Sequence, residues 1–236
     1  TSLGHVRVVS ESLEALTLTG KAPRPVESRD PFLGRSETGR KLVLRMEGQS
    51  RPTEHDLGLD YSVVSTALYA PHHPHVTAFR EEMARCRVYF LEPKEAMRAA
   101  NAVSEVDNLD TRGADLAAFF HTLKHKNEPQ YRSLVLAAKN ILPGIRDIDV
   151  ERTAKGELYI KLSEQNASYS NRLLSEGTLR VLGLLAVLSP SSNSSIICYE
   201  EPENGVHPRR IRQIADLLNE AAGKNRQLLV NTHSPI

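Results

Sequence analysis

The sequence predicts an α/β fold in which a mainly parallel sheet with flanking helices forms the second half of the chain. Ile196 to Tyr199 is a short, continuous apolar run between turn residues, which is typical of a strand in a buried parallel sheet. Gln227 to Asn231 is a second apolar strand of this kind. An amphipathic pattern from Pro208 to Ala222, closed by Gly223, lies between them. One helix between two strands is the connection that parallel pairing requires.

The first half is expected to be β-rich and antiparallel, and a helical insertion follows it. Leu116 to Leu123 and Tyr131 to Leu142 carry apolar residues at helical spacing. Ile145 to Val150 and Leu158 to Leu162 read as antiparallel strands around a turn. We therefore divide the chain into a β-rich part, a helical insertion and a lobe that carries the motifs described below, with the bounds 1–93, 94–144 and 145–236.

Composition narrows the function classes. The chain has 30 basic and 29 acidic residues, and its net charge of +1 gives no overall field that would favour nucleic acid or an anionic membrane. A local basic patch is compatible with this balance. The longest apolar stretch, Leu179 to Leu188, is interrupted by Arg180 and is too short to span a bilayer. Two cysteines, Cys86 and Cys198, form no disulfide framework, so a cytoplasmic protein is expected.

Three short motifs follow one another between residues 172 and 236. They are L-S-E-G-T at 174–178, S-I-I-C-Y-E-E-P at 195–202 and Q-L-L-V-N-T-H-S-P at 227–235. In order and spacing they resemble the signature motif, the Walker B strand and the switch histidine of ATP-binding-cassette (ABC) ATPases. The soluble SMC-like and OLD-like branch, whose Walker B continues as E-P-E-N-G-x-H-P, is most similar. The resemblance implies an ABC-ATPase-like fold of the P-loop NTPase class, with ATP and Mg²⁺ as cofactors.

The second motif places Glu200 and Glu201 at the carboxyl end of a buried strand, where α/β sheets bind ligands. The resemblance implies that Glu200 holds Mg²⁺ through water, and that Glu201 is catalytic and orients the attacking water. The family usually has Asp at the magnesium position, so Glu200 departs from the pattern. The alternative is a pair of exposed carboxylates at a strand end, although buried strand ends seldom carry unpaired charge.

The first motif places Ser175 and Gly177 at the start of a predicted helix from Thr178 to Leu188. The free amides of a helix N-terminus suit a phosphate group, and glycine permits close approach of the backbone. The resemblance implies that Ser175, Glu176 and Gly177 bind the nucleotide held by the other subunit. The alternative is that Ser175 is simply the N-cap of the helix.

The third motif ends in His233, which directly follows the strand–turn sequence 227–232. Its imidazole could donate a hydrogen bond to the terminal phosphate of ATP, which is the catalytic role that the resemblance implies. A lone histidine in this position would more often be structural. Between the second and third motifs lies a turn from Glu203 to His207, which the resemblance places at the loop between two nucleotide sites. The resemblance also implies that Asn204, in this turn, binds the nucleotide.

The sequence has no match to the phosphate loop G-x-x-x-x-G-K-[ST]. Residues 34–41 resemble it superficially, but Arg40 separates Gly39 from Lys41. Leu42 follows where Ser or Thr should bind magnesium, so we interpret this segment as a hairpin turn. The predicted ATPase thus requires a phosphate loop that this chain does not show.

Three histidines, His72, His73 and His75, lie among prolines. Such a tract could suggest a metal site, but no cysteine or carboxylate cluster completes a ligand set. Proline also forces extended backbone before it. We therefore expect a solvated loop.

Function follows from the motifs rather than from the fold. The first hypothesis is an ATP-hydrolysing switch that dimerises head-to-tail around nucleotide. It would control an effector such as a nuclease or toxin, or act on DNA, in bacterial anti-phage defence or DNA repair. The alternative is an ATP-gated binding module with little turnover that holds a partner nuclease or toxin. A self-contained nuclease is disfavoured because no separate cluster of metal-binding carboxylates is visible.

Overall fold

The structure is a computed structural model that describes residues 8–17, 24–25, 31–35, 41–46, 51–56, 62–65, 72–165, 167–190, 192–223 and 226–235. The chain divides into two compact units, Thr1–Ala84 and Arg85–Ile236. All three motifs lie in the second unit. The predicted three-part division, with boundaries after residues 93 and 144, stays a prediction.

The first unit is antiparallel, as the sequence predicts. Its four-stranded sheet has the order β1-β4-β5-β6, and β2 pairs with β3. Leu33, Leu42 and Leu44 are buried with Val63 and Val76 in a small core of its own. The pairing of β4 with β5 fits the predicted hairpin, whose turn at 36–40 lies outside the described residues. The strands and the one 3₁₀ turn described are β1 (Ser12–Leu13), β2 (Leu16–Thr17), β3 (Arg24–Pro25), β4 (Leu33–Arg35), β5 (Lys41–Leu44), β6 (Thr53–Asp56) and η1 (Val63–Ser65).

The histidine tract is not the solvated loop that we expected. Helix α1 begins within it and spans Pro74–Ala84, since proline is favoured in the first turn of a helix. His73 is buried, and the His75 ring stacks on Phe32 with ring centroids 3.9 Å apart. No group of three or more metal-binding side chains occurs among the described residues. The tract therefore packs α1 against the strands of its own unit.

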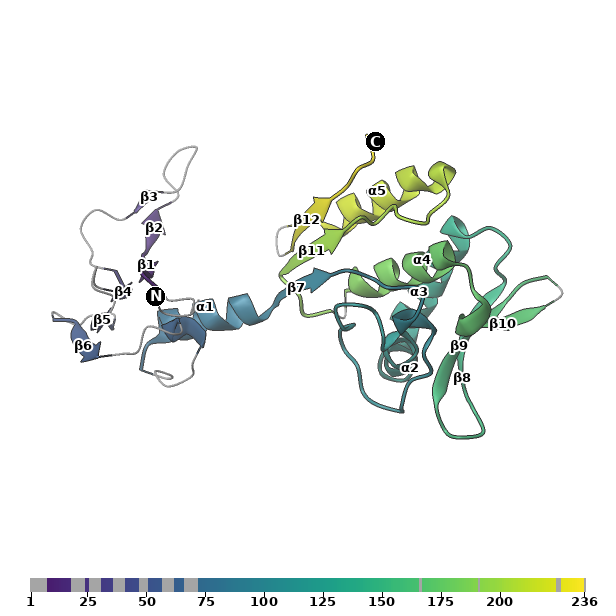
Figure 1. Cartoon of the computed structure of the whole chain (residues 1–236), viewed down its shortest axis with the longest axis horizontal. Helices are drawn as coiled ribbons and strands as arrows, with labels where there is room; N and C mark the ends of the chain where they lie inside the picture. The colour runs from purple at the N-terminus through teal and green to yellow at the C-terminus, as the bar shows by residue number, and fades with distance from the viewer. Residues whose placement is uncertain are drawn as a thin grey trace, which may run out of the picture. The chain divides into compact units, whose positions relative to one another are not determined.

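The second unit contains the predicted parallel sheet. Its order is β12 (Gln227–Asn231), β11 (Ile196–Glu200) and β7 (Cys86–Tyr89), and both pairings are parallel. Along β11, Ile197 and Tyr199 enter the core. The predicted helix between β11 and β12 is a 3₁₀ turn, η4 (Pro208–Arg210), followed by α5 (Ile211–Ala221). Figure 1 shows α4 and α5 alongside these three strands.

The remaining elements of the second unit share one apolar core with that sheet. The predicted helical insertion contains two helices, and the predicted hairpin is the strand pair β8 and β9. The core includes side chains from both helices, from this hairpin and from β7 and β11. These elements are η2 (Ala96–Arg98), α2 (Leu116–Lys126), α3 (Glu128–Ile141), β8 (Asp147–Arg152), β9 (Leu158–Ser163), β10 (Ser168–Ser170), η3 (Asn171–Leu173) and α4 (Glu176–Val187).

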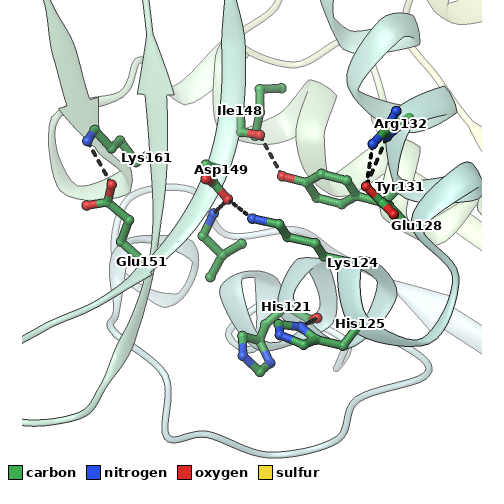
Figure 2. Close-up of polar contacts among 11 residues, drawn as sticks. His121, Lys124, His125, Glu128, Tyr131, Arg132, Ile148, Asp149, Glu151 and Lys161 are labelled. Carbon is green, nitrogen blue, oxygen red and sulfur yellow. Dashed lines mark hydrogen bonds and ion pairs between the residues drawn. The ribbon is translucent and has the colours of Figure 1, made fainter.

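Side chains cover part of the open edge of β8, which is an edge strand in the order β10-β9-β8. The Tyr131 hydroxyl donates to the carbonyl of Ile148 over 2.6 Å, and the Val150 amide donates to the Asp149 carboxylate over 2.7 Å. Lys124 in turn donates to Asp149 over 2.6 Å (Figure 2). An edge strand with unpaired backbone groups can pair with another chain, and these contacts occupy two such groups.

No helix in the described ranges is long and apolar enough to cross a membrane.

Candidate nucleotide site

The predicted catalytic residues come from the carboxyl ends of two adjacent parallel strands. Glu200 is the last residue of β11 and lies opposite Asn231, the last residue of β12. The next amide, that of Glu201, donates to the Asn231 carbonyl over 2.8 Å. Both strands therefore end at the same level of the sheet, which is the edge where α/β folds place their ligands.

Glu201 has an unusual backbone conformation. Its φ of 46° makes it the one residue other than glycine with a positive φ in the part of the chain that the structure describes. This conformation costs about 1–3 kcal/mol for such a residue and persists only where its surroundings enforce it. Here the amide is bonded to Asn231, and the carbonyl accepts from the Asn204 amide over 3.1 Å. The turn after β11 thus fixes the direction of the Glu201 side chain.

That direction brings Glu201 together with His233 and Asn204. One carboxylate oxygen of Glu201 is 3.4 Å from Nε2 of His233, and the other accepts from the Asn204 side-chain amide over 3.1 Å. The Glu201 side chain is 34% exposed and that of His233 is 83% exposed. A polar contact this open to water adds little stability. The arrangement instead leaves a carboxylate and an imidazole side by side, accessible to a ligand.

Glu203, which the sequence places only in the turn from Glu203 to His207, is a further member of this site. Its Oε1 accepts from the Thr232 hydroxyl over 2.6 Å and from the amides of His233 and Ser234 over 2.9 and 3.2 Å. Burial raises the pKa of the Glu203 carboxyl, but these hydrogen bonds outweigh burial and leave its pKa below the ordinary value. The only signal in the sequence was its place in E-P-E-N-G, two residues after Glu201.

The signature residues lie at the start of α4. Ser175 is the N-cap of this helix, and its hydroxyl accepts from the Thr178 amide over 3.1 Å. Glu176 lies in the first turn, where a negative charge interacts favourably with the helix dipole. Among the described residues, Ser175, Glu176 and Gly177 make no hydrogen bond or ion pair with the carboxylates after β11 or with His233. The N-cap role is therefore observed, and a phosphate-binding role stays a prediction.

Gly177 joins the signature helix to the turn after β11. A Cβ atom at this position would lie 2.5 Å from the carbonyl oxygen of Gly205 and 3.6 Å from the Cα atom of Val206. The backbone of the first motif and that of the turn after the second motif thus approach too closely for any side chain at residue 177. Glycine is required here by close packing.

Replacing Gly177 with alanine should lower the free energy of unfolding of the complete protein by about 1–3 kcal/mol, the usual cost of overpacking. Replacing glycine with alanine within a helix normally stabilises a protein by about 0.5–1 kcal/mol. The sign of the change in the free energy of unfolding therefore tests the packing argument. Urea unfolding monitored by circular dichroism measures the change. Gly223→Ala is the control, because its Cβ meets no described atom within 4 Å. Equal stability of Gly177→Ala and the wild type would contradict the packing argument.

The side chains at this sheet edge fit a magnesium ion that is only partly held by protein. Glu200, Glu201 and Asn204 offer the oxygen ligands that Mg²⁺ prefers. No group of three or more His, Cys, Asp or Glu side chains able to hold a metal occurs in the described ranges. Mg²⁺ commonly takes one or two carboxylates and completes its shell with phosphates and water.

The parallel sheet and the family that the sequence matches define the class: an AAA domain. The model of one sequence family matches residues 66–236, and its description is AAA domain, putative AbiEii toxin, Type IV TA system. The chain belongs to this family. No curated protein matches the chain.

Solved structures with a similar fold include SMC heads and an ATP-binding cassette. An SMC head bound to the C-terminal winged-helix domain of ScpA is 12% identical, covers 88% of this chain and 62% of its own, with a TM-score of 0.48. The SMC head of Pyrococcus yayanosii, with a coiled coil and joint, is 14% identical, and the match covers 48% of this chain and 23% of that one with a TM-score of 0.39. A dimeric ATP-binding cassette bound to ADP and Pi is 12% identical, and the match covers 67% of this chain and 57% of that one with a TM-score of 0.36. This chain thus spans less than two thirds of each of these structures.

Proposed function

We propose that this chain is the catalytic part of an ATP-binding and ATP-hydrolysing switch that dimerises head-to-tail around nucleotide. The observation that carries the proposal is the grouping of Glu201, His233 and Asn204 at the carboxyl ends of β11 and β12. Membership of an AAA family supports nucleotide binding.

Glu201 would orient the water that attacks the terminal phosphate. Its backbone is held at a positive φ, and its second oxygen is bonded to Asn204, so the carboxylate is positioned before any ligand binds. Phosphoryl transfer depends mostly on such positioning. His233 is exposed beside it and can donate a hydrogen bond to a phosphate oxygen.

Glu200 would hold Mg²⁺ through water, because the magnesium ion retains much of its hydration shell and glutamate is one methylene longer than aspartate. When bound, the ion neutralises charge on the phosphates. ATP hydrolysis would also require the amide cradle and the lysine of a phosphate loop, and the sequence has no match to that motif.

Ser175, Glu176 and Gly177 would bind the nucleotide of the partner subunit. They lie at the N-terminus of α4, where helix amides suit phosphate. The absence of bonds between these residues and the carboxylates after β11, within the described part of the chain, is compatible with a role across the dimer.

The output of the switch is proposed to be control of an effector such as a nuclease or toxin, or a DNA transaction, in anti-phage defence or DNA repair. The family description, which names a putative toxin of a toxin–antitoxin system, supports an effector. A reducing cytoplasm is proposed as the compartment, because the two cysteines of the chain provide no disulfide framework.

The experiment is to measure phosphate release and molecular mass of the complete protein with ATP and Mg²⁺. We expect an ATP-dependent dimer that returns to monomer as phosphate appears. A stable ATP-bound dimer with negligible turnover would instead support the ATP-gated binding module. If the protein shows no turnover and no ATP-dependent change in mass, the proposal is contradicted.

A further inference from the structure

Glu203 holds the segment after β12 at three consecutive residues. The Thr232 hydroxyl and the amides of His233 and Ser234 all donate to its Oε1, over 2.6, 2.9 and 3.2 Å. Consecutive donors around one anion form a concave arrangement that fixes the backbone locally. The backbone fixed in this way includes the residue that carries the imidazole beside Glu201.

The turn that carries Glu203 is itself held firmly. The amide of Asn204 donates to the carbonyl of Glu201 over 3.1 Å, and that of Val206 donates to the carbonyl of Glu203 over 3.0 Å. On its other side, the turn packs against Gly177 through the carbonyl of Gly205. Glu203 therefore reaches from a fixed turn to a segment whose side chains are largely exposed.

We infer that Glu203 is a positioning residue: it fixes the backbone at His233 so that the imidazole stands beside Glu201. This inference rests on the proposed function for its catalytic consequence, but the link between Glu203 and residues 232–234 can be measured without nucleotide. Glu203 acts through hydrogen bonds to backbone and hydroxyl donors, and it touches no reacting atom.

Replacing Glu203 with glutamine or with alanine distinguishes a positioning role from a role that depends on charge. Oε2 is buried and has no hydrogen-bond partner within the described ranges, and the three bonds to residues 232–234 all run through Oε1. Glutamine keeps an oxygen acceptor of the same reach and loses the charge. Alanine loses both. A positioning role predicts that glutamine retains function, whereas a role that depends on charge predicts that it fails.

The first measurement is amide hydrogen exchange at residues 232–234 in the nucleotide-free complete protein. We expect Glu203→Ala to speed exchange there by about tenfold or more, because the acceptor of two amides is lost. Glu203→Gln should stay close to the wild type. Glu220→Ala is the matched control, because Glu220 is an exposed glutamate of α5 and the substitution is the same. Unchanged exchange in Glu203→Ala overturns the inference.

The second measurement is steady-state ATP hydrolysis by the same variants, by His233→Ala and by the double variant that combines Glu203→Ala with His233→Ala. Glu203→Ala should lower kcat by about tenfold or more with little change in KM, since misplacing a catalytic group by about 1 Å can cost as much as a hundredfold. The double variant should be no slower than His233→Ala, because residues that act as a unit are not additive. Losses that multiply in the double variant, or a glutamine variant as slow as alanine, would overturn the inference.

A wild-type protein that does not hydrolyse ATP would overturn the proposed function alone. In that case, faster exchange in Glu203→Ala still supports the fixing of the backbone at His233, and unchanged exchange overturns it.

Discussion

Replacing Glu201 with glutamine should lower the rate of ATP hydrolysis by the complete protein by about a hundredfold or more, the usual scale for losing a positioned general base. Glutamine keeps the shape of the side chain and an oxygen that can accept from Asn204, but it loses the charge that orients and activates water. ATP binding should survive or tighten, because a negative charge near the phosphates is removed. The variant should therefore accumulate as an ATP-bound dimer.

Phosphate release and ATP-dependent dimer mass, measured together, test this expectation. Glu220→Gln serves as the control, because this exposed glutamate lies on α5 and the substitution is the same. Glu200→Gln should differ from both, since it should weaken the dependence on magnesium as well as the rate. Hydrolysis by Glu201→Gln at the wild-type rate would show that Glu201 is not the catalytic carboxylate.

Replacing Ser175 with arginine should abolish ATP-dependent dimerisation while the monomer remains folded. Ser175 is exposed at the start of α4, so arginine has room in the monomer but would occupy the space that the partner's nucleotide needs. Loss of the bond from the Ser175 hydroxyl to the Thr178 amide should cost about 1 kcal/mol of stability, as for other N-caps. Size-exclusion chromatography with ATP measures the dimer, and thermal unfolding measures the stability of the monomer.

Ser175→Ala separates the steric block from the lost cap. Alanine removes the same hydroxyl and should destabilise the monomer by a similar amount, but it adds no bulk, so part of the dimer should persist with ATP. Normal ATP-driven dimers of Ser175→Arg would contradict the role of the signature across the interface.

The fold class and the main elements of the second unit could be predicted because they depend on local pattern. Apolar runs bounded by turn residues predicted β11 and β12, and helical spacing predicted α2, α3 and α5. The histidine tract was predicted wrongly as a solvated loop, because the stacking of His75 on Phe32 comes from a residue more than forty positions away. Local composition contains no record of such a contact.

For the candidate site, the sequence by itself determined which residue types stand at the strand ends and in what order: paired carboxylates after β11 and a histidine after β12. Only the tertiary structure decided that Glu201 adopts a positive φ, that Glu203 binds the backbone at His233 and that Gly177 packs on Gly205. These features depend on the parallel register of β11 with β12 and on the path of the turn between β11 and α5. Both depend on contacts between segments far apart in sequence, which local periodicity and motif spacing do not record.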